Sequence, residues 1–365
     1  MRTVGVEEEL LLVSKETGEP LAMSAAVLAG TSDDSVFEEE LQLQQLEFGT
    51  RPQSTMDEIE AEIRRWRGEA ARRAGRVGAT VAALGTSPLP VSPSLSPGER
   101  YAWMAEEYGL TANEQLTCGC HVHVSVESDE EGVAVLDRIR PWLAPLLAMT
   151  ANSPFWQAQD TAYASYRSRV WGRWPSAGPV APFGSAEGYH ATVRSMIATG
   201  VLRDEGMIYF DARLSRSYPT VEIRVGDVCL EPEDTVLLAA LVRGLVETSA
   251  AAWRAGEPVP EASVGLLRLA AWRAGRSGLD SQLVDPRTWS PAPAAVVLRA
   301  LVDHVSDALT EYGDLDMVRE RLEALLARGT GARTQRALFE KSGGDLRALV
   351  AECARITAPG PVGIG

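Results

Sequence analysis

Apolar and polar residues alternate in four stretches between residues 4 and 228, and this alternation predicts β-strands. In Pro219–Val228 (PTVEIRVGDV) every second residue is valine or isoleucine from residue 221 to residue 225, and Glu222 and Arg224 lie between them. Because successive side chains of a strand point to opposite faces, one face would pack on a core and the other would present charge. Three more stretches share this design: Val4–Leu12 (VGVEEELLL), Glu38–Thr50 (EEELQLQQLEFGT) and Gly119–Val126 (GCHVHVSV).

A charged strand face is typical of a functional site, although a solvent-facing ion pair on an edge strand would give the same pattern. In the first stretch Glu7 and Glu9 share one face, whereas Glu8 lies on the other. Two carboxylates on one face repel each other unless a cation lies between them. Mg²⁺ prefers such oxygen ligands. We therefore expect a metal at Glu7 and Glu9, with an acidic edge strand that binds nothing as the alternative.

A second pair of carboxylates is predicted within residues Phe37–Pro52. Polar residues alternate with leucine up to Gln44, and a second polar residue, Gln45, then interrupts the pattern. This interruption indicates two strands joined by a tight turn or bulge. Such a reversal of the chain would bring Glu40 and Glu47 close together.

Two cysteines and two histidines within six residues (CGCHVH) are compatible with a zinc site. Strand alternation opposes zinc, because it places Cys118 and Cys120 on one face and the histidines on the other, so that four ligands could converge only through a bulge. We expect instead that His121, His123 and Ser125 face a site and that the valines between them lie in the core.

Residues 152–175 (NSPFWQAQDTAYASYRSRVWGRWP) are rich in aromatic residues and arginine. A polar loop of this composition suits the phosphates and the base of a nucleotide. A protein interface is the alternative, because interfaces enrich the same residue types. A further strand, Ile208–Ser215, follows with Asp211 and Arg213 on one face and leads into Pro219–Val228.

Helical periodicity dominates the remaining sequence. It predicts an amphipathic helix over residues 55–84 with a solvated charged face, and helices over 101–109, 131–151 (broken near its prolines) and 185–203. Residues 85–98 hold four prolines and are expected to form a surface loop. From residue 231 onward the predicted helices are 233–255, 261–275, 291–312, 314–328 and 344–357. The fold class is therefore α+β, with a sheet-forming part (1–230), a helical part (231–358) and a frayed tail (359–365) in a single domain of 365 residues.

Composition argues against some classes of function and indicates a cellular compartment. A formal net charge of −15 argues against a nucleic-acid partner, which would require a basic surface. Neither a signal-peptide pattern at the start nor a run of about 18 apolar residues occurs, so no membrane association is expected. Four cysteines are too few for a disulfide scaffold and fit a reducing compartment. We expect a cytoplasmic protein.

The polar faces of the predicted strands present one set of groups: Glu7, Glu9, Glu40, Glu47, His121, His123, Arg213, Glu222 and Arg224. Carboxylates with one or two imidazoles on several antiparallel strands predict a multinuclear site for divalent metals, because a catalytic dyad would need only two of them. Arginines beside such a site balance phosphate charge, as in phosphoryl transfer. The sequence has no Walker A motif and no GxGxxG before a helix, so ATP would be held by metals and arginines.

Motifs along nearly the whole chain resemble the carboxylate-amine ligase family, also called glutamate-cysteine ligase type 2, of the glutamine synthetase superfamily. In chain order they are GVEEEL, the ExxxxxxE of Glu40 to Glu47, GCHVHVSV, ANSPFW with DTAYASYRSR, YPTVEIRVGDV, AWRAGRSGLD and GTGARTQR. Each motif alone is weak, but together they are specific. The resemblance implies a glutamine synthetase-like catalytic domain, in which a curved antiparallel sheet forms a funnel with helices outside and a helical C-terminal half.

The resemblance also implies roles for individual residues. The implied metal ligands are Glu7, Glu9, Glu40, Glu47, His121 and Glu222. Arg224 is similar to an arginine that neutralises the transferred phosphoryl group, and with Glu222 and Arg213 it forms the implied catalytic set. The implied contacts to ATP or substrate are His123, Arg167, Arg169 and Arg224. The cofactors would be ATP and Mg²⁺, for which Mn²⁺ could substitute.

The implied reaction is ATP-dependent amide formation through an acyl phosphate. The γ-carboxylate of glutamate and the amine of cysteine are the model substrates of the family, which predicts a weak glutamate-cysteine ligase activity with small-molecule partners. The aromatic residues at 156–174 would also suit a homodimer. Three alternatives stay open: a ligase for another acid or amine, a guanidino or carboxylate kinase of the same superfamily, and a zinc-binding non-enzyme that uses Cys118 and Cys120.

Overall fold

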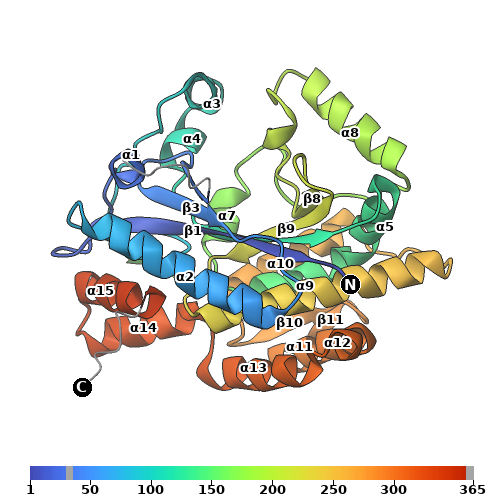
Figure 1. Cartoon of the computed structure of the whole chain (residues 1–365). Coiled ribbons are helices and arrows are strands. Elements are labelled where there is room, and N and C mark those ends of the chain that lie inside the picture. The colour runs from blue at the N-terminus through green and yellow to red at the C-terminus, as the bar shows by residue number, and fades with distance from the viewer. Residues whose placement is uncertain (30–35, 359–365) are drawn as a thin grey trace.

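The computed structural model describes residues 1–29 and 36–358, so the expected frayed tail, 359–365, lies outside the described residues. Within them, an antiparallel sheet of seven strands forms the centre, in the order β2-β3-β1-β5-β9-β8 with β4 also paired to β1 (Figure 1). Its strands are β1 (Val4–Ser14), β2 (Phe37–Glu38), β3 (Gln45–Gly49), β4 (Ala79–Ala82), β5 (Gly119–Ser125), β8 (Ala212–Leu214) and β9 (Thr220–Asp227).

Helices surround this sheet, and α3 and α8 rise on the side opposite α9 and α13 (Figure 1). In the first part of the chain the helices are α1 (Ser24–Leu28), α2 (Met56–Gly75), α3 (Glu99–Tyr108), α4 (Leu110–Glu114), α5 (Asp129–Ile139), α6 (Leu143–Met149), α7 (Arg167–Trp171) and α8 (Ala186–Ala198), with short 3₁₀ turns at Arg140–Trp142 and Glu205–Met207. In the second part they are α9 (Pro232–Arg254), α10 (Val264–Ser277), α11 (Ala294–His304), α12 (Ser306–Tyr312), α13 (Leu315–Arg328), α14 (Gly331–Lys341) and α15 (Leu346–Thr357).

The N-terminal strand β1 organises the sheet, because it pairs with β3, β4 and β5. One of its faces carries Glu7 and Glu9 toward a cleft, as the alternation predicted. The opposite face carries Glu8, which is fully buried and accepts two hydrogen bonds of 2.7 Å from the guanidinium group of Arg67 on α2. The expectation that the charges of this helix form a solvated face is therefore wrong for Arg67, which serves as the internal partner of Glu8.

The predicted helix over 55–84 is too long. It begins close to the predicted start, after a capping box between Thr55 and Glu58, but it ends at Gly75. Gly78 has a φ of +77°, a conformation that favours glycine, and the chain reverses there. The residues that follow form β4 against β1, because an apolar segment at that position completes the sheet.

Two other predicted segments differ in detail. The first strand of the Phe37–Pro52 pair has only two residues, so Glu40 lies in the connection after β2 and not on a strand. The proline-rich segment 85–98 lacks helix and regular strand, but residues 85–89 are buried and not a surface loop. Its polar groups are bonded inside the fold: the Thr86 hydroxyl donates to the carbonyl oxygen of Phe155 at 2.7 Å.

The C-terminal half is helical as predicted, with differences at two places. The predicted helix 291–312 is wrong over its first three residues, which belong to β11 (Ser290–Pro293) in a hairpin with β10 (Gln282–Asp285), and the rest is split into α11 and α12. Helix α14 had no counterpart among the predicted helices. A second short hairpin joins β6 (Phe155–Trp156) to β7 (Gln159–Asp160). Helix α9 is long and apolar enough to cross a membrane, but 78% of its most apolar window is buried within the fold, as in a core helix.

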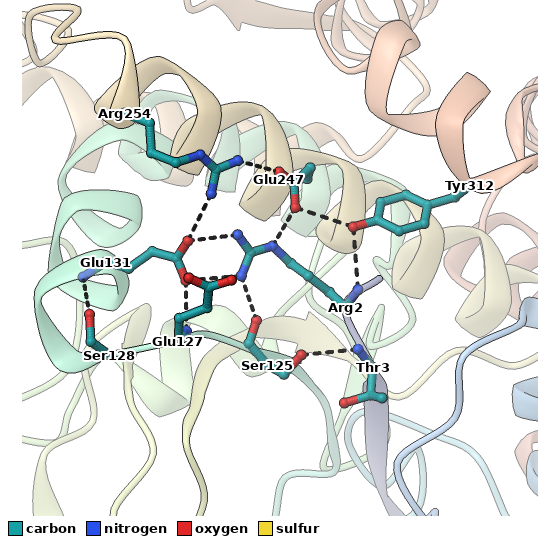
Figure 2. A network of polar contacts seen from close by, with 9 residues as sticks. All are labelled: Arg2, Thr3, Ser125, Glu127, Ser128, Glu131, Glu247, Arg254 and Tyr312. Carbon is teal, nitrogen blue, oxygen red and sulfur yellow. Dashed lines mark hydrogen bonds and ion pairs between the residues drawn. The ribbon is translucent and has the colours of Figure 1, made fainter.

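A buried network of charged groups fixes the start of β1 (Figure 2). The Arg2 guanidinium donates to Glu131 of α5 at 2.8 Å and to Glu247 of α9 at 2.7 Å. It also donates to the carbonyl oxygen of Ser125 at 2.8 Å, and the amide of Thr3 donates to the Ser125 hydroxyl at 3.0 Å. Because Thr3 and Ser125 both line the cleft, this network holds one rim of the cleft against two helices.

Candidate active site

A cleft of about 720 Å³ lies over the charged face of the sheet. It is lined by β1, β3, β5 and β9, by α3, and by the segment around α7. The predicted site residues that line it are Glu7, Glu9, Glu40, Glu47, His121, His123, Ser125, Arg213 and Arg224. Glu222 belongs to the same cluster, but it lies beneath the two arginines and is 1% exposed.

Strand register explains why these residues meet. Glu9 lies opposite Glu47 in the β1–β3 pair, and Glu7 lies opposite His121 in the β1–β5 pair. The next pair, β5–β9, places His123 opposite Glu222. Directly opposed residues have Cβ atoms about 5 Å apart. Three successive strand pairs therefore each contribute one cross-strand pair of ligand-type side chains to the floor of the cleft.

Three overlapping groups could hold metal ions. In each group the candidate ligand atoms lie within 4.8 Å of one another, and the groups are Glu7, His123 and Glu222; Glu7, Glu47 and His121; and Glu9, Glu40 and Glu47. The donors are carboxylate oxygens, with one imidazole in each of the first two groups and none in the third, and such a set suits Mg²⁺ or Mn²⁺. No cysteine takes part in any such group within residues 1–29 and 36–358, so the structure gives no support to the zinc alternative through Cys118 and Cys120.

Burial and mutual repulsion disfavour the charged forms of two carboxylates. Burial and the nearby Glu40 raise the pKa of Glu9 to about 7. Burial and the neighbouring carboxylates also raise the pKa of Glu47 well above its usual range. Glu7 differs: although burial raises its pKa, hydrogen bonds with His121 and His123 lower it well below the usual range. A divalent cation at these groups would relieve the repulsion among the carboxylates.

The two imidazoles have different environments. Burial and the nearby Arg224 lower the pKa of His121 to about 4, so its ring is neutral near pH 7. Burial lowers the pKa of His123, but the contact with Glu7 outweighs it and the net shift is upward. The Nε2 atom of His121 is buried and has no hydrogen-bond partner among the described residues. A neutral imidazole with a free nitrogen is the form that binds metals.

Glu222 is held between two arginines. It accepts a hydrogen bond of 2.7 Å from Nε of Arg213 and contacts the guanidinium group of Arg224. Although burial raises the pKa of Glu222, Arg224 and Arg213 hold it well below its usual range. The Arg224 side chain is 7% exposed, lines the cleft, and has its guanidinium carbon 5.5 Å from the ring centre of Trp171. Glu222 thus fixes two cations beside the carboxylates and imidazoles of the cleft.

Three residues named in the sequence analysis lie outside the cleft. Arg167 and Arg169 line a neighbouring cavity, and this placement does not support the predicted direct contacts with ATP. Arg167 packs over Gly119, so close that a Cβ atom there would clash. Asp211 does not share a face with Arg213, because it occupies a bend before β8, where the strict alternation of a strand does not apply.

The cleft also contains residues that the sequence analysis did not single out. They include Arg51, Arg100, Trp171, Tyr209 and Thr220. Thr220 bonds Nδ1 of His123 at 3.0 Å and orients the ring. Strand alternation could have found Thr220, which lies two residues before Glu222. No sequence pattern indicated Arg100, which enters the cleft from α3 and is paired with Asp204.

The sequence matches a family model described as glutamate-cysteine ligase family 2 over residues 3–352. A relative from Streptomyces avermitilis with the provisional name glutamate–cysteine ligase 2-1 is 62% identical over 98% of this chain and 99% of its own. A relative from Streptomyces coelicolor, provisionally named glutamate–cysteine ligase 2, is 60% identical over the same shares of the two chains.

Solved structures show the same fold at low sequence identity. A glutamate–cysteine ligase from Francisella tularensis, determined in complex with AMP, has a TM-score of 0.71 at 13% identity and covers 98% of this chain and 88% of its own. A bifunctional glutathione synthetase from Pasteurella multocida has a TM-score of 0.72 at 15% identity, with 97% and 52% covered. The predicted α+β class, with a central antiparallel sheet and helices around it, is confirmed.

Proposed function

Since the chain belongs to glutamate-cysteine ligase family 2 and is an ATP-dependent carboxylate–amine ligase, we propose that it joins the γ-carboxylate of glutamate to the amine of cysteine. One observation carries the proposal: a single cleft contains three overlapping groups of candidate metal ligands next to two arginines, Arg213 and Arg224. Such an arrangement positions the phosphates of ATP and neutralises charge during phosphoryl transfer. The names of the relatives support glutamate and cysteine as the substrates.

We propose Mg²⁺ as the metal, held by Glu7, Glu9, Glu40, Glu47, His121 and Glu222. The unpartnered Nε2 of His121 and the mutually repelling carboxylates fit this role. When bound there, Mg²⁺ would supply positive charge that reduces the repulsion between the phosphates of ATP and an incoming carboxylate. His123, held by Thr220 and Glu7, would contact a phosphate or the substrate from the adjacent position.

The reaction then has two steps. A carboxylate oxygen attacks the γ-phosphorus of ATP, the bond to ADP breaks, and an acyl phosphate forms. The amine attacks the carbonyl carbon, phosphate leaves, and the amine loses a proton to give the amide. Arg224 would neutralise the charge that spreads over the phosphoryl oxygens, while Glu222 and Arg213 hold its guanidinium group in place.

We also propose that residues 1–365 form one catalytic domain, with the sheet in 1–230 and helices in 231–358. A single apolar cluster that includes Val4 of β1 and Leu325 of α13 supports this. A cytoplasmic location is supported by four cysteines that are buried and unpaired. A homodimer is supported by the exposed apolar side chains of Leu269 and Trp272 on α10, because their burial in an interface would be energetically favourable.

The carboxylate cluster predicts that Mg²⁺ stabilises the protein in a pH-dependent way. The pKa of Glu9 rises from 4.5 to about 7 on folding, so its contribution to stability is complete below about pH 4.5 and is lost as the pH rises through about 7. Mg²⁺ binds the ionised carboxylates and offsets that loss. We expect Mg²⁺ to raise the melting temperature by several degrees more at about pH 8 than at about pH 5.5. Thermal unfolding with Mg²⁺ or with a chelator measures this.

The control for that prediction is Glu9→Gln, which removes the charge and keeps the shape. Without metal, the melting temperature of this variant should depend less on pH than that of the wild type. Mg²⁺ should also raise it less. An equal Mg²⁺ effect at both pH values in the wild type would contradict binding at these carboxylates.

The proposed reaction is tested by phosphate release from Mg-ATP with glutamate, in the presence and absence of a panel of amines led by cysteine. Mass spectrometry of the products separates the alternatives. Cysteine-dependent phosphate release with a product of the mass of the dipeptide supports the proposal. ADP with a phosphorylated guanidino compound would indicate a kinase, and amine-dependent release only with another acid or amine would replace the substrates and keep the ligase.

A further inference from the structure

A second cavity of about 270 Å³ lies next to the cleft. Its walls come from α6, α7 and α10, from Val225 of β9, and from the segments that precede α6 and β8. None of the residues of the three metal groups lines it. A molecule bound there would therefore lie away from the groups that we propose for the chemistry.

The charged residues of this cavity are strongly unbalanced. They are Asp211 and four arginines: Arg140, Arg167, Arg169 and Arg268. In the part of the chain that the structure describes, none of the four guanidinium groups forms an ion pair within 4.0 Å, and carboxylates act on them only at longer range. Asp211 acts on Arg169 and Arg268, Asp137 acts on Arg140, and Asp227 and Glu9 act on Arg167. Burial disfavours the charged forms of Arg140 and Arg169 and lowers the pKa of each. Among the residues that line the cavity, positive groups therefore outnumber negative ones.

Arg167 is the most deeply buried of the four arginines. Its side chain is 1% exposed, and its Nε and Nη2 atoms have no hydrogen-bond partner among the described residues. These two atoms pack against Gly119, and Asp227 and Glu9 offset part of the charge at longer range. A buried guanidinium group with incomplete hydrogen bonding is costly, and an anion beside it would remove part of that cost. Together with the other arginines of the lining, Arg167 makes the cavity attractive to an anionic group.

Asp211 and the apolar walls narrow the class of ligand. A simple anion such as phosphate would be attracted by the arginines but repelled by Asp211. A molecule with a carboxylate and an ammonium group would satisfy both. The rest of the wall is apolar and includes Leu143, Leu147 and Leu267, which suits a small uncharged side chain. The volume of this second cavity is well below that of the active-site cleft, so the cavity is too small for a nucleotide.

We propose that this cavity is a second ligand site, separate from the active-site cleft, that binds the carboxylate and ammonium groups of a small α-amino acid with an uncharged side chain. The carboxylate lies among Arg167, Arg169 and Arg268, the ammonium group at Asp211, and the side chain against the leucines. The ligand is not consumed, so the site goes beyond the proposed reaction and acts as an effector site.

Trp171 connects this site to the cleft, because it lines both cavities. The guanidinium carbon of Arg167 lies 5.3 Å from the centre of its ring, and that of Arg224 lies 5.5 Å from it. A ligand that draws Arg167 toward its carboxylate changes the contacts of Trp171, and Trp171 contacts the arginine that we assign to the phosphoryl group. Occupancy of the second site is therefore expected to alter the rate of phosphate release.

Calorimetric titration of the full chain, saturated with Mg-ATP, with L-alanine, L-valine and L-leucine tests the proposal. We expect one site per chain for at least one of them. Arg268→Met and, independently, Asp211→Asn should each weaken this binding by about tenfold or more, because each removes a charged hydrogen-bonding group. The matched control is Arg273→Met on the same helix, which lines neither cavity and should bind as the wild type does.

Several outcomes would overturn the assignment. They are the absence of saturable binding of all three amino acids, equal affinities of Arg268→Met and Arg273→Met, and binding of inorganic phosphate or of 3-methylbutanoate as tight as that of L-valine. Phosphate release with glutamate and cysteine is measured on the same variants. Arg268→Met should retain it without added effector, so a failure of the effector site is distinguishable from a failure of the proposed reaction.

Discussion

Replacing Arg224 by methionine is expected to lower amine-dependent phosphate release by about 10³- to 10⁵-fold, the loss found when an arginine that neutralises a transferring phosphoryl group is removed. Arg224 lines the cleft, lies on β9 two residues after a candidate metal ligand, and is fixed there by Glu222. Its charge matters most when negative charge spreads over the phosphoryl oxygens. The loss should therefore appear in kcat more than in KM for ATP.

Arg213→Met is the matched control for this experiment, because Arg213 bonds the same carboxylate from the neighbouring strand. We expect a loss of about 10- to 100-fold, the scale for a residue that positions another group. Equal losses in the two variants would mean that both arginines act only by holding Glu222. Retention of activity within tenfold in Arg224→Met would contradict its role at the phosphoryl group.

Replacing Arg67 by methionine is expected to lower the free energy of unfolding, and this is the second large effect. Arg67 and Glu8 form an ion pair in which the side chains are 1% and 0% exposed. Arg67 also donates to the carbonyl oxygens of Cys229 and Leu230 at 2.7 and 2.9 Å, which ties α2 to β1 and to the segment after β9. Removing Arg67 leaves a buried carboxylate without its charged partner, which costs about 3–5 kcal/mol. Denaturant unfolding measures the change.

Two variants make this result specific to the buried pair. Arg72→Met, on the same helix, removes an exposed partner of Glu69 and should change the free energy of unfolding by less than about 0.5 kcal/mol. Glu8→Gln combined with Arg67→Met should recover part of the loss, because no uncompensated charge is then buried. A loss in Arg67→Met no larger than in Arg72→Met would show that Glu8 obtains its stabilisation elsewhere.

Pattern reasoning was strongest where it relied on the period of a strand. Alternation placed Glu7 and Glu9 on one face and Glu8 on the other, and the structure has them so. The same argument set His121 and His123 apart from the cysteines. This works because the direction of a side chain in a strand is a local property that depends only on the parity of its position.

Pattern reasoning failed where a residue's environment depends on distant parts of the chain. Arg67 resembles other arginines of its helix, and only the packing of α2 on β1 makes it the partner of Glu8. Residues 79–82 continue an alanine-rich segment, and they become a strand because β1 offers an unpaired edge. Asp211 does not lie on the same face as Arg213, because it is in a bend before the strand, where side chains do not alternate regularly.

The sequence by itself determined which strand faces carry carboxylates, imidazoles and arginines, and its motifs indicated the family. Only the tertiary structure decided which of these groups meet. The pairing of Glu9 with Glu47, of Glu7 with His121 and of His123 with Glu222 depends on the register between strands far apart in the chain. The second cavity and its unpaired arginines were likewise invisible in the sequence. Register and burial result from the simultaneous packing of many segments, whereas side-chain alternation is fixed within each strand.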